Sequence, residues 1–117
     1  MGNKRVTVRQ LFDAMEKNYL PKATGQLIIR NGAGDIVSAC AFGQAALHLN
    51  VNPEQLLAGA RQFAKDYNVA ALNEAVHLND SSDSTISAIA RFCRGQVPGR
   101  YLDVPIGYFD ERVTAVG

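Results

Sequence analysis

The sequence contains no tryptophan, only two cysteines and no long run of apolar residues. Its 12 Lys and Arg residues are balanced by 11 Asp and Glu residues, so the formal net charge of +1 provides no overall field that would attract nucleic acid or anionic lipid. No stretch approaches the roughly 20 apolar residues needed to cross a bilayer, and the polar segment 1–5 lacks the apolar core of a signal peptide. We therefore expect a cytoplasmic protein that does not contact a membrane.

The cysteines Cys40 and Cys93 are far apart and form no C-x-x-C pair. Without a sign of an oxidising compartment, two reduced thiols are expected, and a bridge between them is the alternative. Together with His48 and His77 they show none of the close spacings of structural zinc sites. The glycine-rich run 31–35 matches no phosphate-binding motif. The sequence thus predicts neither a metal nor a cofactor.

The length of 117 residues and the hydrophobic content of 47% are typical of one globular domain that buries its own core. Apolar residues at helical spacing follow a capping box at 7–10 and an Asn-Pro start signal at 52–53. Further helix starts are expected at Asn68 and near Asp83 or Ser84. With the helix described next, these signals predict about five short helices.

Two β-branched runs on either side of a glycine-rich turn predict a small β-hairpin over about 26–39. Because an isolated hairpin is marginally stable in water, we expect its apolar face to lie on the helices. Residues 40–49 are small or apolar nearly all round, which predicts a buried central helix starting near Cys40. The expected fold is mainly α, with about five short helices around this central helix and one hairpin.

The chain after Pro98 is apolar but contains proline and glycine, so we expect an extended tail. The sequence therefore divides into a helical domain at 1–97 and a tail at 98–117. The aromatic residues of the tail indicate that it docks on a surface. That surface is either its own domain or a partner subunit, in which case the tail mediates self-association.

Cys40 is the first candidate for chemistry, because a thiol at a helix start lies near free backbone N–H groups that favour the thiolate. A cysteine nucleophile also needs a histidine, and His48 lies about 12 Å away along the same helix at the standard rise. His77 is therefore the candidate base, with Asn79 or Asp80 to orient its ring. The alternative is that Cys40 is a small buried apolar residue and both histidines lie at the surface.

Two short motifs resemble those of a group of small uncharacterised proteins from bacteria and their phages. Residues 38–47, Ser-Ala-Cys-Ala-Phe-Gly-Gln-Ala-Ala-Leu, are similar to the Cys-Ala-Leu-Gly-Ala-like helix start of that group. Residues 78–80, Leu-Asn-Asp, are similar to its later Trp-Asn-Asp turn. Phe42 replaces the usual leucine of the first motif, and Leu78 stands in place of the aromatic residue of the second.

This resemblance covers roughly residues 6–94. The group has no established activity, so the resemblance implies a shared fold and a shared role for Cys40, Asn79 and Asp80, without implying a substrate.

Three functional hypotheses follow. The first is a non-enzymatic binding or regulatory module of bacterial or phage origin that acts through protein contacts, with the tail or the face around the Asn-Asp turn as contact surface. The alternative is a small cysteine-dependent hydrolase or transferase that uses Cys40 with His77. Nucleic-acid binding through Arg91, Arg94 and Arg100 comes last, because the net charge is only +1 and no exposed aromatic residues are expected between these arginines.

Overall fold

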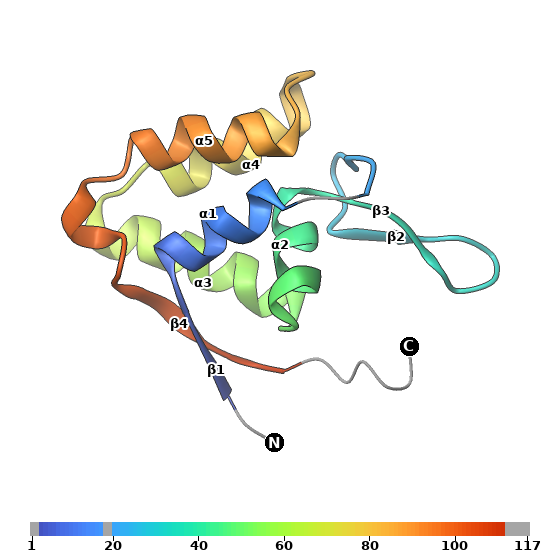
Figure 1. Cartoon of the computed structure of the whole chain (residues 1–117), viewed down its shortest axis with the longest axis horizontal. Coiled ribbons are helices and arrows are strands. Elements are labelled where there is room, and N and C mark those ends of the chain that lie inside the picture. Colours follow the sequence, from blue (N-terminus) through green and yellow to red (C-terminus); the bar gives the residue numbers. More distant parts are fainter. Residues whose placement is uncertain (1–2, 18–19, 112–117) are drawn as a thin grey trace.

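The computed structural model describes residues 3–17 and 20–111 (Figure 1). Their elements follow in this chain order: β1 (Asn3–Thr7), α1 (Val8–Glu16), β2 (Ile28–Arg30), β3 (Ile36–Ala39), α2 (Ala41–Leu49), α3 (Pro53–Tyr67), α4 (Ala71–Ser81), α5 (Ile86–Gly95), a 3-10 turn (Gly99–Tyr101) and β4 (Pro105–Asp110). The prediction of a mainly α fold is confirmed. The sequence analysis expected one hairpin, however, and the described residues form two separate two-stranded antiparallel sheets.

The central helix α2 begins where expected, directly after Cys40. Seven of its nine residues are buried, and it contacts α1, α3 and α4. Cys40 is the N-cap, and its sulfur accepts a hydrogen bond from the backbone N–H of Gly43 at 3.4 Å. A helix made of small residues lets its neighbours approach closely, so α2 lies at the middle of the core.

Two of the predicted helix starts are confirmed by their capping bonds. The Thr7 hydroxyl accepts from the Gln10 backbone N–H at 3.1 Å, and the Gln10 side chain accepts from the Thr7 backbone N–H at 2.8 Å. The Asn52 side chain likewise accepts from the backbone N–H of Gln55 at 3.1 Å. Local sequence therefore determines where α1 and α3 begin.

Other helix ends differ from the prediction. Asn68 ends α3 in the left-handed conformation, with φ of 55°, and does not begin the next helix. The last helix, α5, is capped by Thr85 and begins at Ile86, later than the expected Asp83 or Ser84. An asparagine suits a helix end as well as a helix start, so the sequence signal at 68 was ambiguous.

The second sheet joins the two ends of the chain, because β1 pairs with β4 in antiparallel register. Ile106 and Phe109 of β4 are buried, and the Phe109 ring packs against Gly59 of α3. This part of the predicted tail therefore docks on its own chain, while residues 112–117 lie outside the described residues. The prediction of an extended tail is wrong at the 3-10 turn Gly99–Tyr101.

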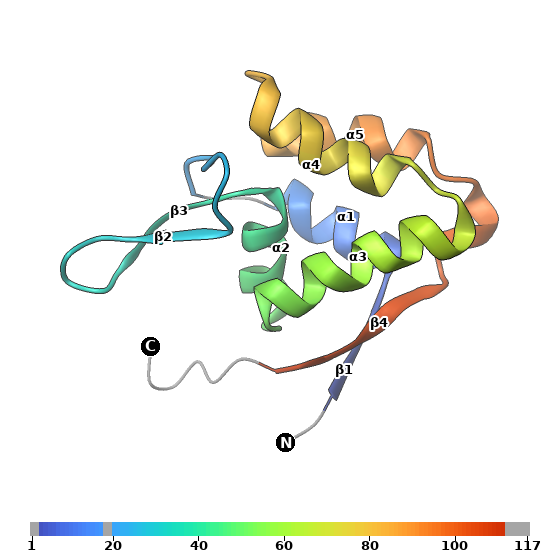
Figure 2. The same ribbon diagram turned by 180° about the vertical axis from the view of Figure 1, so that it is seen from behind.

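The β2–β3 hairpin forms as predicted but projects beside the helices and does not lie on them, as both views of the ribbon show (Figures 1 and 2). Ile28, Ile29 and Ile36 are only half-buried, and Val37 is 40% exposed. The expectation that helices cover its apolar face is therefore wrong. Only the base is anchored, where Ala39 is buried against the core.

Candidate functional site

Cys40, Asn79 and Asp80 line one small pocket at the base of the hairpin, with a volume of about 130 Å³. Its apolar wall comes from four elements or their flanking loops and consists of Leu27, Phe42, Leu57 and Val76. Arg61 of α3 completes the polar rim. The structure thus brings together three residues that lie 39 and 40 positions apart in the sequence.

Asn79 links two of the chain segments around this pocket by hydrogen bonds. Its side chain is buried, its oxygen accepts from the Ala41 backbone N–H at 2.9 Å, and its amide donates to the Ala23 carbonyl at 3.0 Å. Asn79 therefore satisfies a backbone donor at a helix start, and that helix is α2, which begins 38 residues earlier in the sequence. The residue itself lies in the last turn of α4, where the resemblance had implied a turn.

Asp80 accepts hydrogen bonds from the Asn79 side chain at 2.9 Å and from the Gly25 backbone N–H at 3.0 Å. The Asn79 bond is the main cause, and the Gly25 bond the second, of a pKa lowered from the usual value of this carboxyl. Gly25 has a φ of +76°, a conformation that favours glycine. The pocket rim therefore carries a fixed negative charge at neutral pH.

The Cys40 thiol does not have the lowered pKa expected from its place at a helix start. Burial raises its pKa, and this effect exceeds the opposing hydrogen bonds from the Gly43 and Phe42 backbone N–H groups. The negative charge of Asp80 raises the pKa further. Cys40 is therefore a neutral thiol at physiological pH.

The two histidines lie elsewhere. His77 is exposed on α4 and does not line the pocket, and its carbonyl accepts a hydrogen bond from the Ser81 hydroxyl at 2.6 Å. His48 is exposed near the end of α2, beside a shallow hollow that Asp13 and Lys17 also line. The described residues that line the pocket include no histidine to act as base for Cys40.

We predict slow alkylation of Cys40 by iodoacetamide in the native protein at pH 7, because its raised pKa leaves less thiolate than a free thiol has. Its rate should increase as the pH rises through 8 and 9. Cys93 should react more slowly still, since it is fully buried and its pKa is raised to about 11. Mass spectrometry of labelled peptides would measure both rates, and rapid labelling of Cys40 below pH 7 would contradict the prediction.

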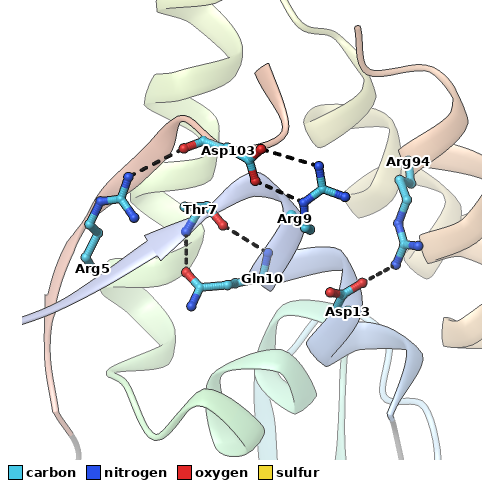
Figure 3. A network of polar contacts seen from close by, with 7 residues as sticks. All are labelled: Arg5, Thr7, Arg9, Gln10, Asp13, Arg94 and Asp103. Carbon is cyan, nitrogen blue, oxygen red and sulfur yellow. Dashed lines mark hydrogen bonds and ion pairs between the residues drawn. The ribbon is translucent and has the colours of Figure 1, made fainter. Parts of the chain in front are cut away.

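The three arginines proposed for nucleic acid do not form a free basic patch. Figure 3 shows Arg94 directed at Asp13, to which it donates at 2.6 Å, and it also pairs with Glu16. Arg100 lies over the Tyr101 ring at 4.7 Å from its centre. Among the interactions of the described residues, Arg91 has no such contact. Arg94 therefore joins α5 to α1, and Arg100 packs on the ring of the neighbouring Tyr101.

A second, wider hollow of about 700 Å³ adjoins the pocket and was not found from the sequence. It lies between β2 and the start of α3 and is lined by residues 26–28, Arg30 and residues 52–54. Gln26 and Leu27 line both cavities. We call the two together the hairpin groove. No sequence signal marks it, because its walls are an ordinary strand and an ordinary helix start.

Among the described residues, no group of three metal-ligating side chains comes together, and no helix has the length and apolar character to cross a bilayer. Comparisons with family models, curated proteins and solved structures found no match. The resemblance to the group of small bacterial and phage proteins therefore stays a prediction.

Proposed function

We propose that this domain is a protein-binding module whose contact surface is the hairpin groove. The observation that supports the proposal best is the exposure of β2, both along its outer edge and at its apolar side chains. In the described part of the chain no strand pairs with its outer edge, and its isoleucines Ile28 and Ile29 are half-exposed.

A two-stranded hairpin with both faces partly in water is marginally stable by itself. Its free edge also presents unpaired backbone N–H and C=O groups, which readily accept another strand. The Leu27 carbonyl accepts from the Cys40 N–H at 3.1 Å toward β3, so by strand alternation the backbone groups of Ile28 point to the outer edge. A partner strand at this edge would complete the sheet.

The chemistry of the groove indicates the kind of partner. An extended segment could hydrogen-bond to β2 while one of its apolar side chains enters the pocket between Leu27, Leu57 and Val76. Asp80 and Arg61 at the rim would then contact polar atoms of the segment. Backbone pairing supplies affinity in this mode, and the pocket supplies selectivity.

The geometry gives less support to the hydrolase or transferase hypothesis. Cys40 does lie in a pocket with Asn79 and Asp80, but His77 does not line that pocket, and burial raises the pKa of the thiol. A nucleophilic cysteine needs a base within hydrogen-bond reach or a lowered pKa. We therefore assign Cys40 to capping α2 and lining the groove.

Selection from a random peptide library displayed on phage tests the proposal. Bound peptides should be apolar and free of proline, and Leu57→Glu should weaken their binding at least tenfold by placing a charge in the pocket wall. Phe92→Glu is the matched control, since Phe92 is 55% exposed on α5 and outside the groove. Peptides that bind both variants equally well, or a library that yields no binder, would count against the proposed function.

A further inference from the structure

We infer that the pocket at the base of the hairpin binds the free amino terminus of a partner polypeptide whose first residue has a leucine- or phenylalanine-sized side chain. This assignment rests on the proposed function and names the kind of segment that the hairpin groove takes. The first side chain fills the pocket, the α-ammonium group pairs with Asp80, and the following residues lie along β2.

The first support is the carboxylate of Asp80, which lines the pocket and has one oxygen available to a ligand. Its Oδ1 accepts both of its hydrogen bonds, from the Asn79 side chain and from the Gly25 backbone N–H. Within the described residues, Oδ2 accepts no hydrogen bond and no cation forms an ion pair with this carboxylate. The nearby Lys22 ammonium donates instead to two backbone carbonyls at and after the end of α4, at 2.7 and 2.8 Å. A cationic ligand group would therefore meet a carboxylate that is already held in position.

The second support is the size and lining of the pocket. Its volume of about 130 Å³ is close to that of an apolar cavity of about 150 Å³ that binds benzene in another protein. Its apolar walls are Leu27, Phe42, Leu57 and Val76, and the Cys40 thiol also lines it. A sulfur atom near the edge of an aromatic ring makes a favourable contact. A phenylalanine or leucine side chain therefore suits this pocket, whereas an indole ring is larger and a charged side chain would lose its hydration.

The third support is the short distance that the pocket imposes between the apolar side chain and the positive charge. Asp80 lines the same small pocket as the apolar walls, so the charge has to lie within one residue of the buried side chain. In an extended segment the adjacent side chain points to the opposite face, and the next one on the same face begins about 7 Å further along. An α-ammonium group belongs to the same residue as the first side chain and therefore satisfies both conditions.

A carboxyl terminus suits the same site less well. Its carboxylate would meet the negative charge of Asp80, whose pKa is lowered mainly by the Asn79 hydrogen bond. Arg61, the one cationic side chain among the described residues that line the pocket, is exposed and forms no ion pair with them. A charge that is already fixed contributes more to binding than one whose side chain must first be ordered. The rim of the pocket therefore favours an amine over a carboxylate.

The order of the two cavities along β2 sets the direction of the bound segment. The pocket is lined by residues 25–27, and the wider hollow by residues 26–28 and Arg30, nearer the hairpin turn. A segment that begins at Asp80 and passes over the hollow therefore runs parallel to β2. Its third side chain would face this wide hollow, because alternate side chains share a face. We therefore expect selectivity to be concentrated at the first residue.

The experiment titrates the full chain with two synthetic peptides, each with a dye at its carboxyl end. One is Phe-Thr-Val-Ser-Val-Thr with a free amino terminus, and the other is the same peptide with an acetylated amino terminus. Fluorescence anisotropy should show that the free amine binds at least about tenfold more tightly, the effect of a hydrogen bond between charged groups. Leucine at the first position should retain this affinity, and glutamate or tryptophan there should weaken it.

Asp80→Asn tests the carboxylate, and Asp83→Asn is the matched control. The asparagine retains an oxygen that can accept from the Gly25 N–H but has no charge, so this variant should bind both peptides as weakly as the unaltered chain binds the acetylated one. Asp83 is exposed in the loop after α4 and lines neither cavity, so its variant should keep the preference for the free amine. A thermal melt of each variant would show that it remains folded.

A nitroxide at the carboxyl end of the free-amine peptide tests the direction of binding. It should broaden the NMR signals of residues 31–35 more than those of residues 23–25. The opposite pattern would overturn the parallel arrangement and place the amino terminus away from Asp80.

Equal affinities of the free and acetylated peptides for the unaltered chain, or an unchanged preference in Asp80→Asn, would overturn the inference. If acetylated apolar peptides bind as tightly as free ones and Leu57→Glu weakens both, the proposed function stands and only this inference fails. If neither peptide binds and the random library yields no binder, the proposed function and this inference fail together.

Discussion

Replacing Gly43 with alanine should destabilise the protein by about 2 kcal/mol or more, although alanine is the better helix former. A Cβ atom at this position would lie 1.9 Å from the Leu27 carbonyl oxygen and 2.9 Å from its carbonyl carbon. Overpacking a core costs about 1–3 kcal/mol and occasionally more, and here the obstacle is a backbone group that cannot rotate away. The gain in helix propensity, about 1 kcal/mol, offsets only part of that cost.

The backbone oxygen cannot move without a further loss. It accepts the hydrogen bond from the Cys40 N–H, which joins the base of the hairpin to the start of α2. Relief of the overlap would therefore separate the segment before β2 from the central helix. Faster amide exchange at Cys40 should accompany the loss of stability, and the proposed binding site should open at the same time.

Urea denaturation would measure this effect, with Gly95→Ala as the matched control. Gly95 is also helical, at the end of α5, and a Cβ atom there would meet nothing within 4 Å. The control should leave the free energy of unfolding unchanged or raise it by up to about 1 kcal/mol. Equal stabilities for the two variants would show that α2 and the hairpin base are not closely packed at Gly43.

The elements that sequence analysis predicted well are those whose signals lie within a few residues of one another. The Thr7 box and the Asn52-Pro53 start are such signals, and both were confirmed by their own capping bonds. The β1–β4 sheet could not be found in this way. Its first strand contains charged residues and one buried valine, Val6, and becomes a strand because β4, about a hundred residues later, pairs with it.

The candidate site shows the same limit. Cys40 was selected as a thiol at a predicted helix start, and Asn79 and Asp80 as groups that could orient a histidine; the resemblance of short motifs implied a shared role for all three. No spacing rule indicated that the asparagine would cap the helix that begins beside the cysteine. His77 was chosen because His48, the other histidine, lies too far from Cys40 along the same helix, but nearby helical residues such as His77 and Asn79 point in different directions. Leu57 and Val76 line the pocket, but their sequence pattern is that of ordinary apolar helix positions. These residues form a groove only because the tertiary structure brings their helices and the hairpin together.

Asn79→Ala should lower the free energy of unfolding by about 2–6 kcal/mol, because two buried backbone groups would lose their hydrogen-bond partner. Truncation leaves the Ala41 N–H and the Ala23 carbonyl without their partner, and each unsatisfied buried group costs about 1–3 kcal/mol. A small domain has a total stability of only about 5–15 kcal/mol, so the change should be evident in a thermal melt. Asn73→Ala is the matched control, because Asn73 is exposed on the same helix, and it should change the stability by less than about 0.5 kcal/mol.

Asn79→Asp separates the donor role of this side chain from its acceptor role. The introduced carboxylate could still accept from Ala41, but at neutral pH it would face the Ala23 carbonyl and the Asp80 carboxylate with no hydrogen to donate. Its pKa in the folded protein should therefore be raised above the unfolded value. A raised folded pKa means that the variant regains stability at acidic pH and loses it as the pH rises through that pKa, so its deficit relative to the unaltered protein should be smaller at pH 4 than at pH 7. A deficit that does not change with pH would show that the amide donor bonds of Asn79 contribute little, and the capping of α2 would then depend on the acceptor alone.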